Sequence, residues 1–296
     1  MRAFTMAIAA RKAVSPETLL KLGRVSNLPT VWTNVLAGTV LAGGAWDARR
    51  TGLVVVAMSL FYVGGMYLND YFDRGIDARE RPQRPIPAGD VSAATVAALG
   101  FAMLALGVAL MAMMGATAAF AGALLAAVVV AYDLFHKNNP LAPVVMGLCR
   151  ALVYGGAAAA AIGAVPLALA IAALAMLAYV AGLTYAARQE SLDRVGNLWP
   201  LVALAAPAVL ALPALRQGVA AGLIYLALIG CAGFAIYLLA KRPMPGAVAR
   251  AVGILIAGIS LVDAALLAAA GAILPALLAV VGFVMTLALQ KYIPGT

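Results

Sequence analysis

The sequence predicts an all-α membrane protein, a helical bundle with nine or ten transmembrane helices. Hydrophobic residues make up 65% of the 296 residues and charged residues only 10%, and the mean hydropathy is +1.03. Soluble domains carry roughly one quarter charged residues. Apolar stretches long enough to cross a hydrocarbon core of about 30 Å as helices recur along the whole chain. Period-2 alternation of polar and apolar residues, which would indicate a transmembrane barrel, is absent from the sequence.

Ten apolar segments are expected to form these helices within a single domain that covers residues 1–296. They are residues 28–46, 52–70, 93–114, 116–133, 141–163, 166–187, 198–214, 219–240, 248–270 and 272–290. The last two segments are two helices or one helix interrupted at Gly271 and Pro275, so nine or ten spans are expected. Residues 1–27 contain a short apolar patch before Arg11 and Lys12 but no convincing cleavage site, which predicts a cytoplasmic lead-in.

The distribution of basic residues predicts which side of the membrane each connection faces. The chain carries 20 Lys and Arg against 11 Asp and Glu, a net charge of +9. If the N-terminus is cytoplasmic and ten spans alternate, sixteen of these basic residues lie on one side, which the positive-inside rule makes the cytoplasm. We therefore expect an integral protein of a bacterial inner membrane whose basic residues contact membrane lipid and not nucleic acid.

A cluster of acidic residues follows the second apolar segment, in the sequence NDYFDRGID at 69–77. Asp70, Asp73 and Asp77 are three and four residues apart, so on a helix they share one narrow arc. Carboxylates this close repel each other, and the cluster is expected to need a neutralising cation. Mg²⁺ is the expected cation, because it binds one or two carboxylates and completes its shell with water and phosphate oxygens.

A second segment, QESLDRVGN at 189–197, aligns with the first without gaps at an offset of 120 residues. Both segments follow an apolar helix on the same predicted side, which suggests a bundle of two pseudo-repeated halves. At the same spacing the second segment offers Glu190, Asp193 and Asn197. Solvated loops are the alternative for both segments, but membrane topology favours basic residues there and does not explain three acids on one arc.

Basic residues near these acids supply the other half of a phosphate site, since guanidinium groups bind phosphate oxygens bidentately. The nearest ones are Arg81, Arg84, Lys137 and Arg188. Acidic segments, basic side chains and an apolar cavity between the helices together suit a diphosphate head that carries a long hydrocarbon tail.

The first acidic segment resembles a known family. NDYFDRGID followed by RPQRPIPAG is similar to the first aspartate-rich motif and following loop of the UbiA superfamily of intramembrane prenyltransferases, with Asn69, Asp70, Asp73 and Asp77 at the motif's positions. The hydropathy pattern extends the resemblance over nearly the whole chain. Residues 132–154, YDLFHKNNPLAPVVMGLCRALVY, resemble the divergent EboC-type branch of that superfamily, which would leave the acceptor undefined.

The family's second motif, a tyrosine and a lysine followed by aspartates and a glycine, is matched only in altered form by YAARQESLDRVGN. Positions that agree are Tyr185, Asp193 and Gly196, and altered positions are Arg188, Glu190 and Asn197. An amide at position 197 lacks the charge of a carboxylate, so the second metal site is expected to be weaker than in the family pattern.

The resemblance implies an enzyme that transfers a prenyl group from an isoprenyl diphosphate to an acceptor. Mg²⁺ would assist departure of the diphosphate, and an apolar cavity would shield the allylic cation until the acceptor attacks. The implied metal ligands are Asp70, Asp73, Asp77, Glu190, Asp193 and Asn197, of which Asp70, Asp73 and Asp193 are assigned the catalytic role. The implied substrate-binding residues are Asn69, Arg81, Arg84, Lys137, Arg150, Tyr185 and Arg188.

A transporter or noncatalytic carrier of a lipid diphosphate is the alternative, favoured by the repeated halves and the altered second motif. Arg150 and Asp263 lie within apolar segments, where charged side chains are costly. They pair with each other, or Arg150 reaches the diphosphate or the acceptor. His136, the single histidine, is expected in a loop near the headgroups. Three tyrosines are expected either to line the cavity or to pack between helices: Tyr62, Tyr67 and Tyr154.

Overall fold

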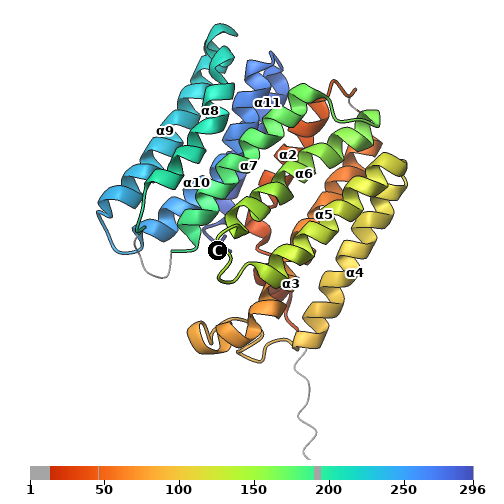
Figure 1. Cartoon of the computed structure of the whole chain (residues 1–296), viewed down its shortest axis with the longest axis vertical. Coiled ribbons are helices and arrows are strands. Elements are labelled where there is room, and N and C mark those ends of the chain that lie inside the picture. Colours follow the sequence, from red (N-terminus) through yellow and green to blue (C-terminus); the bar gives the residue numbers. More distant parts are fainter. Residues whose placement is uncertain (1–13, 46, 190–194, 296) are drawn as a thin grey trace, which may run out of the picture.

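The computed structural model describes residues 14–45, 47–189 and 195–295, and every regular element within them is helical (Figure 1). The helices are α1 Pro16–Leu22, η1 Val25–Asn27, α2 Leu28–Leu41, α3 Ala48–Glu80, α4 Ala93–Ala112, α5 Ala116–Phe135, α6 Ala142–Ile162, α7 Leu167–Ala187, η3 Trp199–Ala205, α8 Ala206–Leu210, η4 Leu212–Arg216, α9 Val219–Lys241, α10 Ala247–Ala269 and α11 Ile273–Leu289. Eight helical segments are long and apolar enough to cross a membrane, and α11 is a shorter apolar helix. The chain is thus an all-α integral membrane bundle, as predicted.

The C-terminal end of the chain decides between nine and ten predicted apolar helices. The last two apolar segments are separate helices, α10 and α11, because the chain turns at Gly271, which has a φ of +78°. Glycine adopts this left-handed conformation without the steric cost that a Cβ imposes. Each of the ten predicted apolar segments therefore corresponds to helical structure in the described residues.

The seventh predicted span differs from a regular helix. Residues 199–216 form a short 3₁₀ helix, one and a half turns of α-helix and a second 3₁₀ helix. Pro200, Pro207 and Pro213 explain the interruption, because proline lacks a backbone N–H and its ring clashes with the preceding turn. Hydropathy detected the segment but carried no information about its hydrogen bonding.

Helix α3 is longer than its apolar segment. It has 33 residues, about 50 Å at 1.5 Å per residue, so its C-terminal turns extend past a hydrocarbon core of about 30 Å. Asp47 caps its N-terminus by accepting hydrogen bonds from the backbone N–H groups of Arg49 and Arg50. The acidic segment 69–77 consequently continues the same helix and is not a loop.

Small residues let neighbouring helices approach closely. Gly100 on α4 lies against α3, where an added Cβ would come within 2.8 Å of Leu68 Cγ. Glycine at such contacts is typical of membrane helices, whose association depends on close van der Waals packing. This contact holds α3 in place beside α4.

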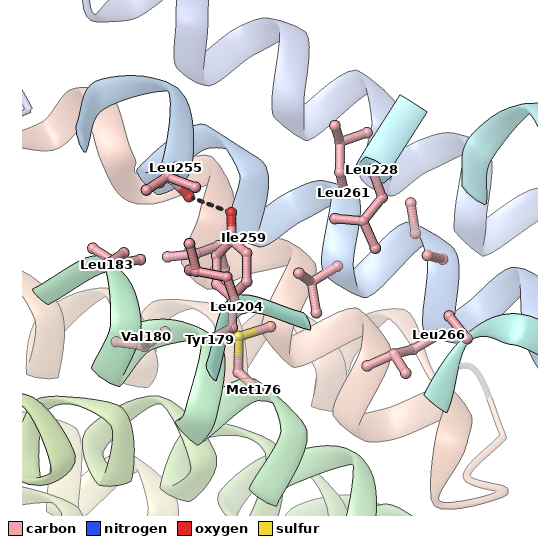
Figure 2. Packing of buried hydrophobic residues seen from close by; sticks show 14 of the residues in the cluster. Met176, Tyr179, Val180, Leu183, Leu204, Leu228, Leu255, Ile259, Leu261 and Leu266 are labelled. Atoms are coloured by element: carbon pink, nitrogen blue, oxygen red, sulfur yellow. Dashed lines mark hydrogen bonds between the residues drawn. The ribbon is translucent and has the colours of Figure 1, made fainter. Parts of the chain in front are cut away.

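Most of the core falls into two halves, and both include residues of α2 and α6. In one half, Figure 2 shows Tyr179 on α7 among Leu183, Leu204 and Ile259, with its hydroxyl donating to the carbonyl oxygen of Leu255 at 3.0 Å. The other half forms where α3, α4, α5 and α6 meet, with Phe61 among its buried residues. The connections that follow α3, α5 and α9 lie at one end of the bundle, together with the C-terminal end of α7 (Figure 1).

Candidate active site

The last turns of α3 present acidic side chains on one buried face. Asp70, Asp73 and Asp77 retain only 7%, 6% and 4% exposure, and Asn69 beside them is also almost buried. Because α3 continues unbroken to Glu80, the spacing of three and four residues places these side chains on one arc.

Two arginines from different segments neutralise Asp70 and Asp77. Arg24, just before η1, places Nη2 3.2 Å from Asp70 Oδ1, and Arg84, in the connection after α3, places Nη1 3.1 Å from the same oxygen. Arg84 Nη1 also lies 3.0 Å from Asp77 Oδ2. A single guanidinium thus bridges two carboxylates that would otherwise repel each other.

Asp73 faces the connection between α5 and α6. Lys137 Nζ lies 3.0 Å from Asp73 Oδ2, and His136 Nε2 lies 3.4 Å from Asp73 Oδ1. The imidazole stacks on the ring of Tyr132 with 5.0 Å between centroids. His136 therefore belongs to the acidic cluster, a more specific position than the loop near the headgroups that we expected.

Asp73 and the basic partners of the three aspartates line a polar cavity of about 260 Å³, which we call the outer chamber, whereas Asp70 and Asp77 are not among its lining residues. Its charged and amide lining residues are Arg24, Asn27, Asn69, Asp73, Arg81, Arg84, Lys137, Arg150 and Arg188. Arg188 is oriented by a hydrogen bond from Nη1 to the carbonyl oxygen of Asn139 at 2.8 Å. A concave surface with this many guanidinium groups suits a polyanion such as a diphosphate.

A smaller apolar cavity of about 80 Å³, the inner chamber, adjoins the outer one. Aliphatic and aromatic side chains make up most of its wall, among them Val31, Phe61, Leu125 and Val153. The residues that line both chambers are Tyr62, Met66, Tyr132, Met146 and Arg150. Polar and apolar environments therefore meet at a boundary inside the bundle.

Arg150 lies at this boundary, and a chain of hydrogen bonds holds its guanidinium group in place. Its Nη1 donates to Asn34 Oδ1 at 3.0 Å, and Asn34 Nδ2 donates to both oxygens of Asp263 at 3.0 and 2.8 Å. Tyr154 also donates its hydroxyl hydrogen to Asp263. The expected pairing of Arg150 with Asp263 is therefore indirect, with Asn34 between them, and it leaves the guanidinium 5.5 Å from the centre of the Tyr62 ring.

The remaining predicted residues differ in where they lie. Arg81 reaches the outer chamber, whereas Tyr185 on α7 packs against the hydrophobic core. Asn197 is exposed, and its Oδ1 accepts a hydrogen bond from the backbone N–H of Trp199 at 3.0 Å. Glu190 and Asp193 lie outside the described residues, so the comparison of the two acidic segments stays a prediction.

Two of the three tyrosines lie away from the chambers. Tyr67 donates to the carbonyl oxygen of Leu19 at 3.0 Å and ties α1 to α3, and Tyr154 is buried beside Asp263. Only Tyr62 of this group is among the residues that line the chambers.

The carboxylates of α3 fit a magnesium ion by their chemistry. Among the described residues, no three Asp, Glu, His or Cys side chains form a group that would hold a metal on its own. Mg²⁺ needs only one or two carboxylates when phosphate oxygens and water fill its other positions. The described contacts of Asp70 run through Oδ1 and those of Asp77 through Oδ2, so each carboxylate has a second oxygen that these contacts do not use.

Comparison with known families identifies the chain. A model of the UbiA prenyltransferase family matches residues 30–244. The chain belongs to this family. The digeranylgeranylglyceryl phosphate synthase of Natronomonas pharaonis is 32% identical over 170 residues, which are 54% of this chain and 59% of that protein. The enzyme of that name from Methanothrix thermoacetophila is 41% identical over 76 residues, 25% of this chain and 28% of that protein. The chain thus spans less than two thirds of the length of these curated relatives.

Solved structures share the fold of this UbiA-family chain. A UbiA homolog from Aeropyrum pernix K1 superposes with a TM-score of 0.65 at 21% identity and covers 80% of this chain and 96% of its own. A UbiA homolog from Archaeoglobus fulgidus bound to GPP and Mg²⁺ has a TM-score of 0.58 at 16% identity and covers 84% and 99% of the two chains.

Sequence reasoning missed three residues of the site in this UbiA-family chain. Arg24 lies 46 residues from Asp70 in the chain, in the segment predicted to be a cytoplasmic lead-in. Tyr132 and Asp133 were included in an apolar span. An acidic residue at the end of such a span is itself a signal, because ionisable groups at membrane depth are costly.

Proposed function

We propose that this chain transfers an isoprenyl group from an isoprenyl diphosphate to the hydroxyl group of an acceptor that carries an apolar chain. The observation that carries the proposal is the junction of a basic outer chamber with an apolar inner chamber. A diphosphate needs guanidinium and ammonium donors, whereas a prenyl tail needs apolar surface, and the donor substrate joins both groups covalently. Membership in the UbiA prenyltransferase family supports this activity.

The basic residues of the outer chamber bind the diphosphate. Arg24 and Arg84 now contact Asp70, but each guanidinium has five N–H donors and can contact phosphate oxygens as well. Arg81, Lys137 and Arg188 add positive charge to the same wall, with Asn69 as a neutral partner. Tyr185 is assigned to substrate binding only through the motif resemblance.

Residues at the boundary between the chambers act on the bond between the first carbon of the donor and the diphosphate oxygen. With its diphosphate in the outer chamber and the start of its tail at the inner one, the donor places its first carbon near Tyr62 and Arg150. Arg150 would stabilise charge that develops on the departing oxygen. The apolar wall of the inner chamber keeps water from the allylic cation.

Magnesium completes this proposal. Bound Mg²⁺ would neutralise charge on the departing diphosphate. We assign its ligands to Asp70, Asp73 and Asp77, with Glu190, Asp193 and Asn197 from the second acidic segment. The solved UbiA homolog bound to GPP and Mg²⁺ supports the pairing of this ion with a prenyl diphosphate in the family.

The names of the curated relatives suggest the acceptor. Their product, digeranylgeranylglyceryl phosphate, carries two geranylgeranyl groups, so their last transfer joins one group to an oxygen of a glyceryl phosphate that already bears the other. We propose the same acceptor class, a hydroxyl of a prenylated glyceryl phosphate. The basic connections at the site end of the bundle favour a site that faces the cytoplasm of a bacterial inner membrane.

The test uses the whole chain in lipid nanodiscs with geranylgeranyl diphosphate and a monogeranylgeranyl ether of glyceryl phosphate. We expect the diether by mass spectrometry with Mg²⁺ and not with EDTA. Arg84→Gln should lower the rate at least tenfold, because it removes charged hydrogen bonds, whereas Arg49→Gln, an exposed arginine in the first turn of α3 at the opposite end, should not. If the wild-type chain binds the donor but forms no diether even with Mg²⁺, the result would favour the carrier alternative and contradict the enzyme.

A further inference from the structure

Asp133, near the C-terminal end of α5, is a buried carboxylate with an unused oxygen. The side chain is 4% exposed, and Asn69 Nδ2 donates to its Oδ1 at 3.2 Å. Its Oδ2 is buried and has no hydrogen-bond partner among the described residues. Neither the acidic motifs nor the roles proposed above involve this residue.

Asp133 lies close to the place proposed for the reaction. Asp133 lines the inner chamber, and its partner Asn69 lines the outer one. The hydrogen bond between them therefore crosses the boundary between the chambers. Tyr132, the preceding residue, lines both chambers. If the diphosphate occupies the outer chamber, its first carbon would lie at the boundary between the chambers. Asp133 lies beside that boundary, on the side of the inner chamber.

The energetics of an unpaired oxygen indicate what it binds. Buried polar atoms nearly always have a hydrogen-bond partner, and a buried charged group without one is strongly unfavourable. A prenyl tail offers no hydrogen-bond donor, and the phosphates, which are acceptors, would repel a carboxylate. A donor group on the second substrate, at the level of the reacting carbon, would supply the missing partner.

We propose that Asp133 is the residue that binds and deprotonates the acceptor hydroxyl. This inference rests on the proposed function. The acceptor O–H donates to Asp133 Oδ2, which directs the oxygen lone pair at the first carbon of the donor. The bond from that carbon to the diphosphate oxygen breaks, and its electron pair leaves with the diphosphate. The acceptor oxygen then bonds to the carbon, and its proton moves to Asp133.

The contact with Asn69 makes Asp133→Asn a selective test. Asn69 Nδ2 donates to the Oδ1 position, so the amide oxygen of the variant should take that position. The amide NH₂ then replaces Oδ2, which turns a hydrogen-bond acceptor into a donor of nearly the same shape. Asp47→Asn is the matched control, because it makes the same change at the N-cap of α3 at the other end of the bundle, where asparagine and aspartate cap equally well.

The binding experiment compares two probes in nanodiscs: the monogeranylgeranyl ether of glyceryl phosphate and its O-methyl derivative, in which the reacting hydroxyl cannot donate. Wild-type protein should bind the hydroxyl probe about tenfold more tightly, the usual effect of a hydrogen bond to a charged group. The preference should disappear in Asp133→Asn and persist in Asp47→Asn. Equal binding of the two probes by the wild type would overturn the inference, and that comparison requires no variant to fold.

The kinetic experiment separates the acceptor from the donor. Asp133→Asn should slow diether formation by about 100-fold, within the range for loss of a general base. Positional isotope exchange in ¹⁸O-labelled donor, which reports ionisation without an acceptor, should stay at the wild-type rate. A parallel fall in isotope exchange would place Asp133 at the donor cation and overturn the inference. No transfer by the wild type would refute the proposed function, whereas unchanged transfer by Asp133→Asn would refute this inference alone.

Discussion

Lys137 Nζ lies 3.0 Å from Asp73 Oδ2, although the two residues are far apart in the sequence. The contact joins the second aspartate of α3 to the connection between α5 and α6, directly beside the outer chamber. A diphosphate in that chamber would meet the ammonium group and the carboxylate together. The pair therefore brings together, in one contact, a residue proposed to bind phosphate and a residue proposed to bind the cation.

Asp73→Asn should weaken the binding of Mg²⁺ and of diphosphate together. The ion is bound jointly by protein and substrate, so removing one carboxylate charge affects both ligands. We expect at least a tenfold loss of geranylgeranyl diphosphate affinity in the presence of Mg²⁺ and a smaller loss in EDTA, measured by equilibrium binding in nanodiscs. Asp47→Asn serves as control. Diphosphate binding that is indifferent to both Mg²⁺ and the substitution would contradict the metal site.

Asn197→Asp should strengthen the proposed second metal site. An aspartate supplies charge as well as an oxygen ligand, and its carboxylate can still accept the hydrogen bond from the backbone N–H of Trp199. The Mg²⁺ concentration at half-maximal turnover should fall several-fold, with turnover preserved or raised. A tighter metal with lower turnover would indicate specialisation around the amide. Unchanged metal dependence would mean that position 197 does not face the ion.

Gly100→Ala should destabilise the bundle, because the new methyl group would lie 2.8 Å from Leu68 Cγ. Overpacking of this kind costs about 1–3 kcal/mol in free energy of unfolding. Gly52→Ala in α3 is the matched control, since a Cβ there meets nothing within 4 Å and alanine favours helix by up to about 1 kcal/mol. Unfolding in detergent, followed by circular dichroism, should rank the variants in that order. Equal stability of the two variants would refute close α3–α4 packing.

Cysteine labelling should place the acidic segments on the cytoplasmic side. Residues 69–92, 134–140, 188–197 and 241–247 carry most of the basic residues expected inside. We propose single-cysteine variants Arg79→Cys and Arg194→Cys in a chain with Cys149 and Cys231 replaced by alanine. Both should react with a membrane-impermeant maleimide only after the membrane is opened, whereas Arg49→Cys at the other end of α3 should react in intact cells. Labelling of positions 79 and 194 in intact cells would contradict a shared cytoplasmic site.

The sequence by itself determined the architecture and one face of the site. Its apolar segments specify membrane helices, because every backbone polar group in a hydrocarbon core must be hydrogen-bonded within its own segment. Hydropathy alone locates these helices, although it predicted neither the length of α3 nor the interrupted helix at 199–216. The arc shared by Asp70, Asp73 and Asp77 follows from helical periodicity, and so could be predicted before any coordinates. Local rules suffice for both features.

Only the tertiary structure decided which residues surround that face. The contacts of Arg24 with Asp70, of His136 with Asp73 and of Asn34 with Asp263 join residues 46, 63 and 229 positions apart. Such pairs depend on how helices pack, and packing in a membrane depends on small residues and side-chain shape, which hydropathy does not encode. The unpaired oxygen of Asp133 is likewise visible only in the folded bundle, because a missing partner is a property of everything that surrounds it.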